Sequence, residues 1–142
     1  MIRLPPFTYL APRTLGDAAK ALAEHGADAM VVAGGTDLYP NMKRLQFEPK
    51  VLVGLRGIRD LRGVRGSARE GLTIGAGTTL SAVAGHPEIA ARYPALATAA
   101  GLVSSPQLRN MGTLGGNVCV DTRCNYYNQS HEWRKAVGFC MK

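Results

Sequence analysis

The sequence lacks any apolar run that approaches the roughly 20 residues needed to cross a bilayer. Its N-terminal stretch, MIRLPPFTYL, also lacks the long apolar core of a signal peptide. These two absences predict a cytoplasmic protein with no membrane partner. The chain has 142 residues, of which 46% are hydrophobic, enough for one compact core or for two small lobes that share an interface.

Acidic residues are few: 10 Asp and Glu stand against 17 Lys and Arg, which gives a formal charge of +7. Such an excess can indicate a nucleic-acid partner. Here the arginines of residues 56–69 are spread among Asp60 and Glu70, with no run of like charge and no recognition-helix pattern. We therefore expect no nucleic-acid partner, and read the basic residues as a solvated face or one that docks an acidic subunit.

Several sequence motifs are missing. The chain has no G-x-G-x-x-G after a strand and no G-x-x-x-x-G-K-[ST] loop, so neither standard nucleotide-binding fingerprint is present. It also has no HExxH, nucleophile elbow or Ser/His/Asp set, and we expect no acid–base catalytic residue. Cysteine is scarce, with three residues spaced C-x4-C-x15-C, which lacks the second pair of a usual zinc site.

Apolar periodicity and turn residues predict an α+β chain. We expect helices over 15–25 and 37–45 and strands over 29–33 and 51–55, a β-loop-α-β unit that favours parallel pairing. A hairpin over 62–67 and 72–76 follows, then helices over 80–84, 87–93 and 94–102. The predicted division places residues 1–57 in an N-terminal α/β lobe and residues 58–142 in a second, incomplete α+β lobe.

Glycine is abundant, with 17 residues, and three glycine-bearing segments suggest ligand contact. The first, AGGTD (33–37), lies between a strand and a helix, where successive N–H groups can form an anion nest. Asp37 would repel a phosphate, so we expect its carboxylate to cap the following helix. A plain tight turn is the alternative for this segment, because glycine is the default turn residue.

The second segment, GAGTT (75–79), repeats the order of glycines, hydroxyls and helix start. The third, RNMGTLGGN (109–117), ends in a glycine pair that would allow close backbone approach to a flat ring or a pyrophosphate. Three such segments in one small chain favour a long, phosphate-bearing ligand, and a dinucleotide fits better than a mononucleotide.

Two stretches, VVAGGTDLYPNMK (31–43) and RNMGTLGGNV (109–118), resemble the two flavin-binding signatures of the molybdenum hydroxylase flavoproteins, the FAD subunits of xanthine and carbon monoxide dehydrogenase relatives. They stand in the same order as in that family and are joined by IGAGTTL (74–80). The resemblance implies a truncated two-lobed FAD-binding domain of the molybdopterin dehydrogenase type, with FAD extended between the lobes. The first segment would hold the pyrophosphate and the others would line the rest of the cofactor. The cofactor-binding residues so implied are Ala33, Gly34, Gly35, Thr36, Asp37, Leu38, Gly75, Gly77, Thr78, Thr79, Asn110, Thr113, Gly115, Gly116 and Asn117.

The polar, aromatic tail, NVCVDTRCNYYNQSHEWRKAVGFCMK (117–142), closely resembles the insertion that marks the flavin subunits of 4-hydroxybenzoyl-CoA reductases. By that resemblance, residues 119–142 begin an iron–sulfur insertion in which Cys124 and Cys140 are two ligands of a [4Fe-4S] cluster. The other two would follow Lys142, so we expect the chain to be the N-terminal fragment of a longer subunit. Cys119 looks like an unliganded neighbour, although C-x4-C keeps it a candidate and ordinary packing remains open for it.

The resemblance implies an electron-transfer flavoprotein subunit and no catalytic residue in this chain. The partners would be a large molybdenum-cofactor subunit, a small [2Fe-2S] subunit and reduced ferredoxin as electron donor, in the reductive dehydroxylation of 4-hydroxybenzoyl-CoA. One alternative is the FAD subunit of a xanthine or carbon monoxide dehydrogenase. Another is a non-enzymatic zinc or nucleic-acid-binding module.

Overall fold

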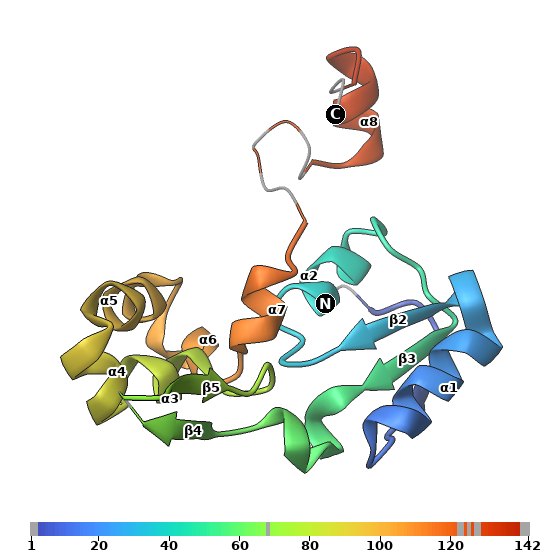
Figure 1. Ribbon diagram of the computed structural model, residues 1–142. Helices are drawn as coiled ribbons and strands as arrows, with labels where there is room; N and C mark the ends of the chain where they lie inside the picture. Colours follow the sequence, from blue (N-terminus) through green and yellow to red (C-terminus); the bar gives the residue numbers. More distant parts are fainter. Residues whose placement is uncertain (1–2, 68, 122–123, 125, 127–128, 140–142) are drawn as a thin grey trace.

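A computed structural model describes residues 3–67, 69–121, 124, 126 and 129–139. Its N-terminal part is built on a three-stranded parallel sheet (Figure 1). The strands are β1 (Thr8–Leu10), β2 (Ala29–Val32) and β3 (Val51–Gly54), in the order β1-β3-β2. Thr8 and Ala29 both pair with Val51, so all three strands end at the same edge of the sheet.

Helix α1 (Leu15–His25) covers one face of the sheet. The Thr14 hydroxyl accepts a hydrogen bond from the Asp17 N–H at 3.1 Å, and Gly26 ends the helix, so its bounds agree with the predicted range 15–25. Ala18 packs there against Val51 and Val53, two alternate residues of β3. The intervening Leu52 faces the other side of the sheet, since successive strand residues point to opposite faces.

Helix α2 (Leu38–Lys43) covers that second face, where Leu38 and Met42 pack against Leu52 and Val32. The predicted helix over 37–45 is thus one residue too long at its start and two at its end. The chain leaves helical geometry at Leu45, whose φ is 56°. Short 3-10 turns over Gly26–Asp28, Leu55–Gly57 and Arg59–Leu61 complete the connections of this part.

The C-terminal part pairs a hairpin with a group of helices. Strands β4 (Val64–Ser67) and β5 (Gly71–Ile74) are antiparallel, as expected. Helices α3 (Leu80–Ala84), α4 (Pro87–Arg92) and α5 (Pro94–Leu102) follow at the predicted positions. Leu80, Val83, Ile89 and Ala100 form their common core, which also takes in Leu72 and Ile74 of the hairpin.

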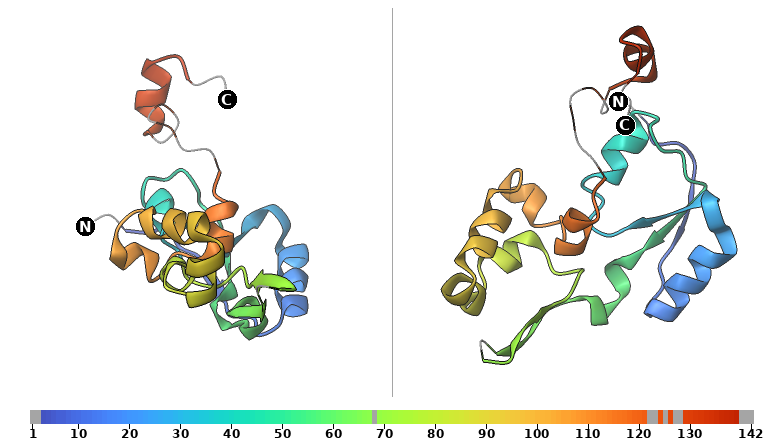
Figure 2. Two further views of the ribbon diagram at one scale, coloured as in Figure 1. Left: turned by 60° about the vertical axis from the view of Figure 1, so that its left-hand side comes forward. Right: turned by 45° about the horizontal axis from the view of Figure 1, so that its top comes forward.

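Four elements were not predicted: β1, α6 (Pro106–Arg109), α7 (Leu114–Val118) and α8 (His131–Ala136). Each has six residues or fewer, so none shows a clear apolar period. Helix α7 lies between the sheet with α2 and the helical group, whereas α8 projects away from both (Figures 1 and 2). A hydrogen bond of 3.2 Å from Gln46 Nε2 to the Gln129 carbonyl ties this tail to the segment after α2.

The mixed helix and sheet content confirms the α+β expectation. Ile58, just beyond the predicted boundary, packs in the same cluster as Val51 and Val53, and the division at residues 57 and 58 stays a prediction. In the described ranges, no helix has the length and apolarity to traverse a lipid bilayer.

Candidate functional site

The first glycine segment begins where β2 ends, at the edge that carries the carboxyl ends of all three parallel strands. Ligands of parallel sheets bind at this kind of edge. Within the described part of the chain, the backbone N–H groups of Gly34, Gly35 and Thr36 donate to no protein acceptor, and the Thr36 hydroxyl also has no partner. These three residues are half-buried, and successive N–H groups without a protein acceptor can form a nest for an anionic ligand.

Asp37 does not cap α2 through its side chain, contrary to the prediction. It stands at the N-cap position with helical backbone angles and makes no side-chain cap bond. Its Oδ1 instead accepts a hydrogen bond from Asn41 Nδ2 at 3.2 Å. The helical φ and ψ explain the difference, because a capping carboxylate needs an extended N-cap backbone.

The second segment packs against the connection between the two parts of the molecule. The Gly77 N–H donates to the Leu61 carbonyl at 2.6 Å, and a Cβ at Gly75 would collide with the same carbonyl. The Thr78 hydroxyl accepts from the Gly63 N–H at 3.0 Å and donates to the Gly63 carbonyl at 3.2 Å. Thr78 is 6% exposed, so its hydroxyl stabilises the protein itself. The Thr79 hydroxyl caps α3 through the Ala82 N–H.

The third segment is a helix start rather than a loop. Thr113 caps α7, its hydroxyl accepting from the Gly116 N–H at 3.1 Å, and Gly115 and Gly116 lie in the first turn. A Cβ at Gly115 would lie 2.7 Å from the Ala76 Cβ. The glycine therefore permits close packing of α7 on the second segment, a role that the sequence analysis did not assign to it.

Three backbone hydrogen bonds join the third segment to the second segment and to Leu80, which directly follows it. Leu80 donates to the Gly112 carbonyl at 2.9 Å, Leu114 to the Thr78 carbonyl at 2.9 Å, and Gly115 to the Ala76 carbonyl at 2.8 Å. Thr79 and Thr113 form an isolated antiparallel bridge between them. These two segments, about 35 residues apart in the chain, make one continuous backbone surface.

The first segment packs against the third segment, which thus lies between the first and the second. A Cβ at Gly34 would collide with the Met111 carbonyl and lie 3.1 Å from the Gly112 Cα. The Ala33 Cβ lies 4.0 Å from the position that a Cβ on Gly116 would take. The third segment thus touches both others, which brings the three predicted segments together around α7 (Figure 1).

The other predicted site residues differ in which of their atoms remain available to a ligand. Leu38 is buried in the core on α2, so only its backbone is available to a ligand. Asn110 Oδ1 accepts from the Ser81 hydroxyl at 2.7 Å, which ties α6 to α3. Gly116 and Asn117 are exposed on α7. Met111 and Gly112 were not predicted as contacts of Gly34, because only the tertiary structure brings these distant residues together.

The tail cysteines are only partly described. Cys124 is half-buried, Cys119 is exposed at the end of α7, and Cys140 lies outside the described residues. Among the residues whose placement is given, no three His, Cys, Asp or Glu side chains gather as metal ligands would.

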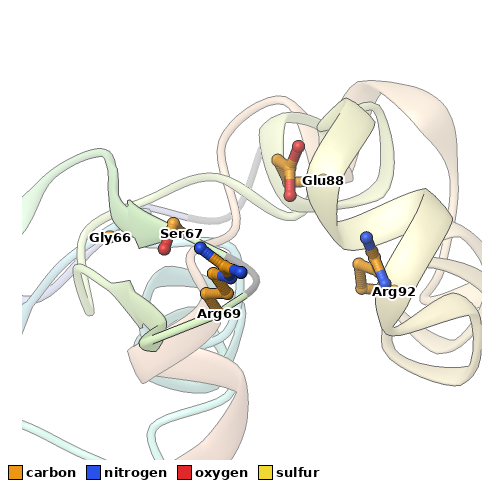
Figure 3. A pocket seen from close by; sticks show the side chains of 5 residues that line it. All are labelled: Gly66, Ser67, Arg69, Glu88 and Arg92. Atoms are coloured by element: carbon orange, nitrogen blue, oxygen red, sulfur yellow. The ribbon is translucent and has the colours of Figure 1, made fainter.

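A separate hollow of about 490 Å³ lies between the hairpin and α4 (Figure 3). It is lined by Gly66, Ser67, Arg69, Glu88 and Arg92, all of them exposed. It shares no residue with the three glycine segments, so its arginines do not contribute to the candidate site.

Comparisons with known proteins match this chain to flavin-binding domains. The profile of the FAD binding domain in molybdopterin dehydrogenase matches residues 5–129. The carbon monoxide dehydrogenase medium chain of Hydrogenophaga pseudoflava is 42% identical over 116 residues, and the nicotinate dehydrogenase FAD-subunit of Eubacterium barkeri is 34% identical over 117. These alignments cover 80% and 82% of this chain and 39% of each relative, so the chain spans about two fifths of their length.

Solved structures give the same result. A carbon monoxide dehydrogenase from H. pseudoflava that lacks the Mo-pyranopterin moiety superimposes with a TM-score of 0.77 at 41% identity, over 82% of this chain and 40% of that one. Quinoline 2-oxidoreductase from Pseudomonas putida 86 gives 0.74 at 35% identity, over 80% and 39%. The sequence match and the shared fold together show that this chain belongs to the family of FAD-binding domains in molybdopterin dehydrogenases.

Proposed function

We propose that the chain binds FAD along its three glycine segments, with the pyrophosphate at the first. The observation that supports this most strongly is the set of unbonded N–H groups at Gly34, Gly35 and Thr36, at the edge where three parallel strands end. The backbone of 75–79 and 109–117 would line the remainder of the cofactor. These segments make few demands on side chains, which suits recognition through backbone amides.

The role of the chain would be to bind and orient FAD within a larger enzyme. FAD supplies the electron-transfer chemistry when bound, and the protein supplies position and environment. The hydroxyls of Thr78, Thr79 and Thr113 bond to the backbone of the protein itself, so we assign none of them a role as acid or base on an organic substrate. We infer a large molybdenum-cofactor subunit and a small [2Fe-2S] subunit as partners.

For the substrate we propose 4-hydroxybenzoyl-CoA. In its reductive dehydroxylation, two electrons and two protons replace the phenolic hydroxyl with hydrogen and release water. The support is the sequence of the tail, in which Cys124 and Cys140 would ligate a [4Fe-4S] cluster that receives electrons from reduced ferredoxin. The geometry of the described residues adds nothing to this assignment, because it gathers no ligand set.

The alternative is a FAD subunit of the carbon monoxide or xanthine dehydrogenase type. It is favoured by the identities of 42% to a carbon monoxide dehydrogenase medium chain and 33% to a putative xanthine dehydrogenase FAD-binding subunit of Escherichia coli. This alternative predicts FAD without an additional [4Fe-4S] cluster, so iron content separates the two proposals.

Flavin binding is tested on the protein as its gene encodes it. After incubation with FAD and gel filtration, we expect flavin absorbance bands to co-elute with the protein. FMN lacks the second phosphate and the adenine, so we expect it to bind at least about tenfold more weakly. Elution of the protein without flavin bands, or equal affinity for FMN and FAD, would contradict the proposed extended site.

The cluster is tested separately by iron and sulfide analysis after anaerobic purification of the same protein. We expect about four iron atoms per subunit, as a cubane requires. Cys124→Ser is expected to lose them, whereas Cys119→Ser is the matched control that retains them. Flavin without iron would support the carbon monoxide or xanthine type, and zinc without flavin would support a non-enzymatic module.

A further inference from the structure

The ring of Tyr39 occupies the space beside Gly35. A Cβ built on Gly35 would collide with the ring at Cε2 and lie 2.6 Å from Cδ2. Gly35 also has a φ of 72°, a backbone conformation that residues other than glycine rarely adopt. The first glycine segment and the aromatic ring of the next helix are therefore in direct contact.

The ring is fixed by the core beneath it. Tyr39 packs on the cluster of Val32, Leu38, Met42 and Leu52, three of which are 3% exposed or less. Its backbone N–H donates to the Gly35 carbonyl at 3.3 Å. The same residue thus contacts Gly35 through both its side chain and its main chain.

The phenol of Tyr39 is uncharged near neutral pH, since even an unperturbed tyrosine has a pKa of about 10. Burial, with a smaller effect of the neighbouring Tyr9, raises the pKa of Tyr39 above its ordinary value. A neutral ring places no negative charge next to donors that would face a phosphate. Tyr39 can therefore lie against an anion site without repelling its ligand.

On its other side, the first segment is held by the third. Gly34 lies so close to Met111 and Gly112 that a Cβ there would collide with the Met111 carbonyl. Gly34 and Gly35 are thus packed from two directions, by a backbone and by a ring. Glycine loses more conformational freedom on ordering than any other residue, so two adjacent glycines need such support to hold one geometry.

We propose that Tyr39 is a positioning residue for the pyrophosphate of FAD. Its ring keeps Gly35 in the left-handed conformation, and so keeps the backbone that carries the N–H groups of Gly34, Gly35 and Thr36 in one arrangement. An ordered set of donors binds more tightly because less entropy is lost on binding. This inference rests on the proposed FAD site and adds a residue whose side chain need not touch the cofactor.

The experiment compares Tyr39→Ala with Tyr39→Phe in the protein as its gene encodes it. Dissociation constants are measured for FAD by fluorescence titration and for ADP, which shares the pyrophosphate, by competition. We expect Tyr39→Ala to weaken both ligands by the same factor, about tenfold or more. Tyr39→Phe keeps the ring and is expected to stay within about twofold of the parent protein.

Val83→Ala is the matched control for lost stability. Val83 is fully buried in the other core and is not among the close neighbours of Gly34 or Gly35, so we expect its truncation to lower stability without moving Gly35. We expect its affinity for FAD to be unchanged. The inference is overturned if Tyr39→Ala binds FAD as the parent does, if Tyr39→Phe is as weak as Tyr39→Ala, or if Val83→Ala is equally weak. A parent protein that binds no FAD would instead overturn the proposed function.

Discussion

Gly34 and Gly35 are glycines for different physical reasons. Gly35 has a positive φ and a ring against it, so both its conformation and its surroundings exclude a side chain. Gly34 is excluded from bearing a side chain only by the backbone at Met111 and Gly112. A backbone neighbour cannot rotate away as a side chain can, so substitution at Gly34 must separate the first and third segments.

We therefore expect Gly34→Ala to lower the free energy of unfolding by about 1–3 kcal/mol, the usual cost of an overpacked site. It should also weaken FAD binding, since it displaces the donors beside it. Gly101→Ala in α5 is the matched control. The nearest atom to its added Cβ is the Ala84 Cβ at 3.8 Å, an ordinary contact, and alanine favours a helix. Urea unfolding checks both, and equal stability of the two variants would refute the packing argument.

The raised pKa of Tyr39 gives a prediction at alkaline pH. Because the folded protein holds the phenolic proton more tightly than the unfolded chain, stability falls as pH rises through the interval above the ordinary pKa of about 10. Below that pH the group adds no pH dependence. We expect the free energy of unfolding of the parent protein to fall more steeply above about pH 10 than that of Tyr39→Phe. Parallel pH profiles for the two proteins would show that folding does not raise the pKa of Tyr39.

At the scale of elements, α7 connects the two halves of the site. It is only five residues long, too short to be stable without its contacts. Its first turn is fixed by the cap at Thr113 and by the close packing of Gly115 on Ala76. A helix held in this way depends on its cap more than a long helix does.

We expect Thr113→Ala to lower the free energy of unfolding by about 1 kcal/mol, the usual cost of a lost cap, and Thr113→Ser to restore most of it. Ser130 offers the matched control, since its hydroxyl caps α8 through the Trp133 N–H at 3.2 Å. Helix α8 projects away from both cores (Figures 1 and 2), so Ser130→Ala is expected to leave the main unfolding transition in place. Thermal unfolding compares the three variants, and a larger loss for Ser130→Ala would contradict this arrangement.

For the whole molecule, the convergence of three distant segments predicts a common response to one ligand. On addition of FAD, we expect hydrogen exchange to slow together at residues 33–38, 75–79 and 109–117. The hairpin end near Gly71 and helix α1 serve as internal controls. Among the described residues, neither forms a hydrogen bond or a close glycine contact with these three segments. Mass spectrometry of deuterium uptake would measure this, and protection of one segment alone would mean that the ligand does not extend across all three.

Much of the architecture is predictable because its signals are local. Helix α1 has its own cap and stop in Thr14 and Gly26, and α3 has Thr79, so both begin where the sequence predicts. The short β1 and α6 carry too few residues for a period and are defined by their partners instead. Asp37 shows the limit of local reasoning, because its carboxylate bonds to Asn41 once the backbone there becomes helical.

The sequence by itself determined helix α1, the hairpin, helices α3 to α5, the three glycine segments and the resemblance to a flavin-binding family, because each depends on residues close together in the chain. Only the tertiary structure decided that Gly34 faces Met111, that Gly115 packs on Ala76 and that Tyr39 lies against Gly35. Those contacts join residues from separate elements, and their distances are set by how the sheet, α2 and α7 pack. A glycine in a sequence shows that a side chain is absent, and only the fold shows what occupies its place.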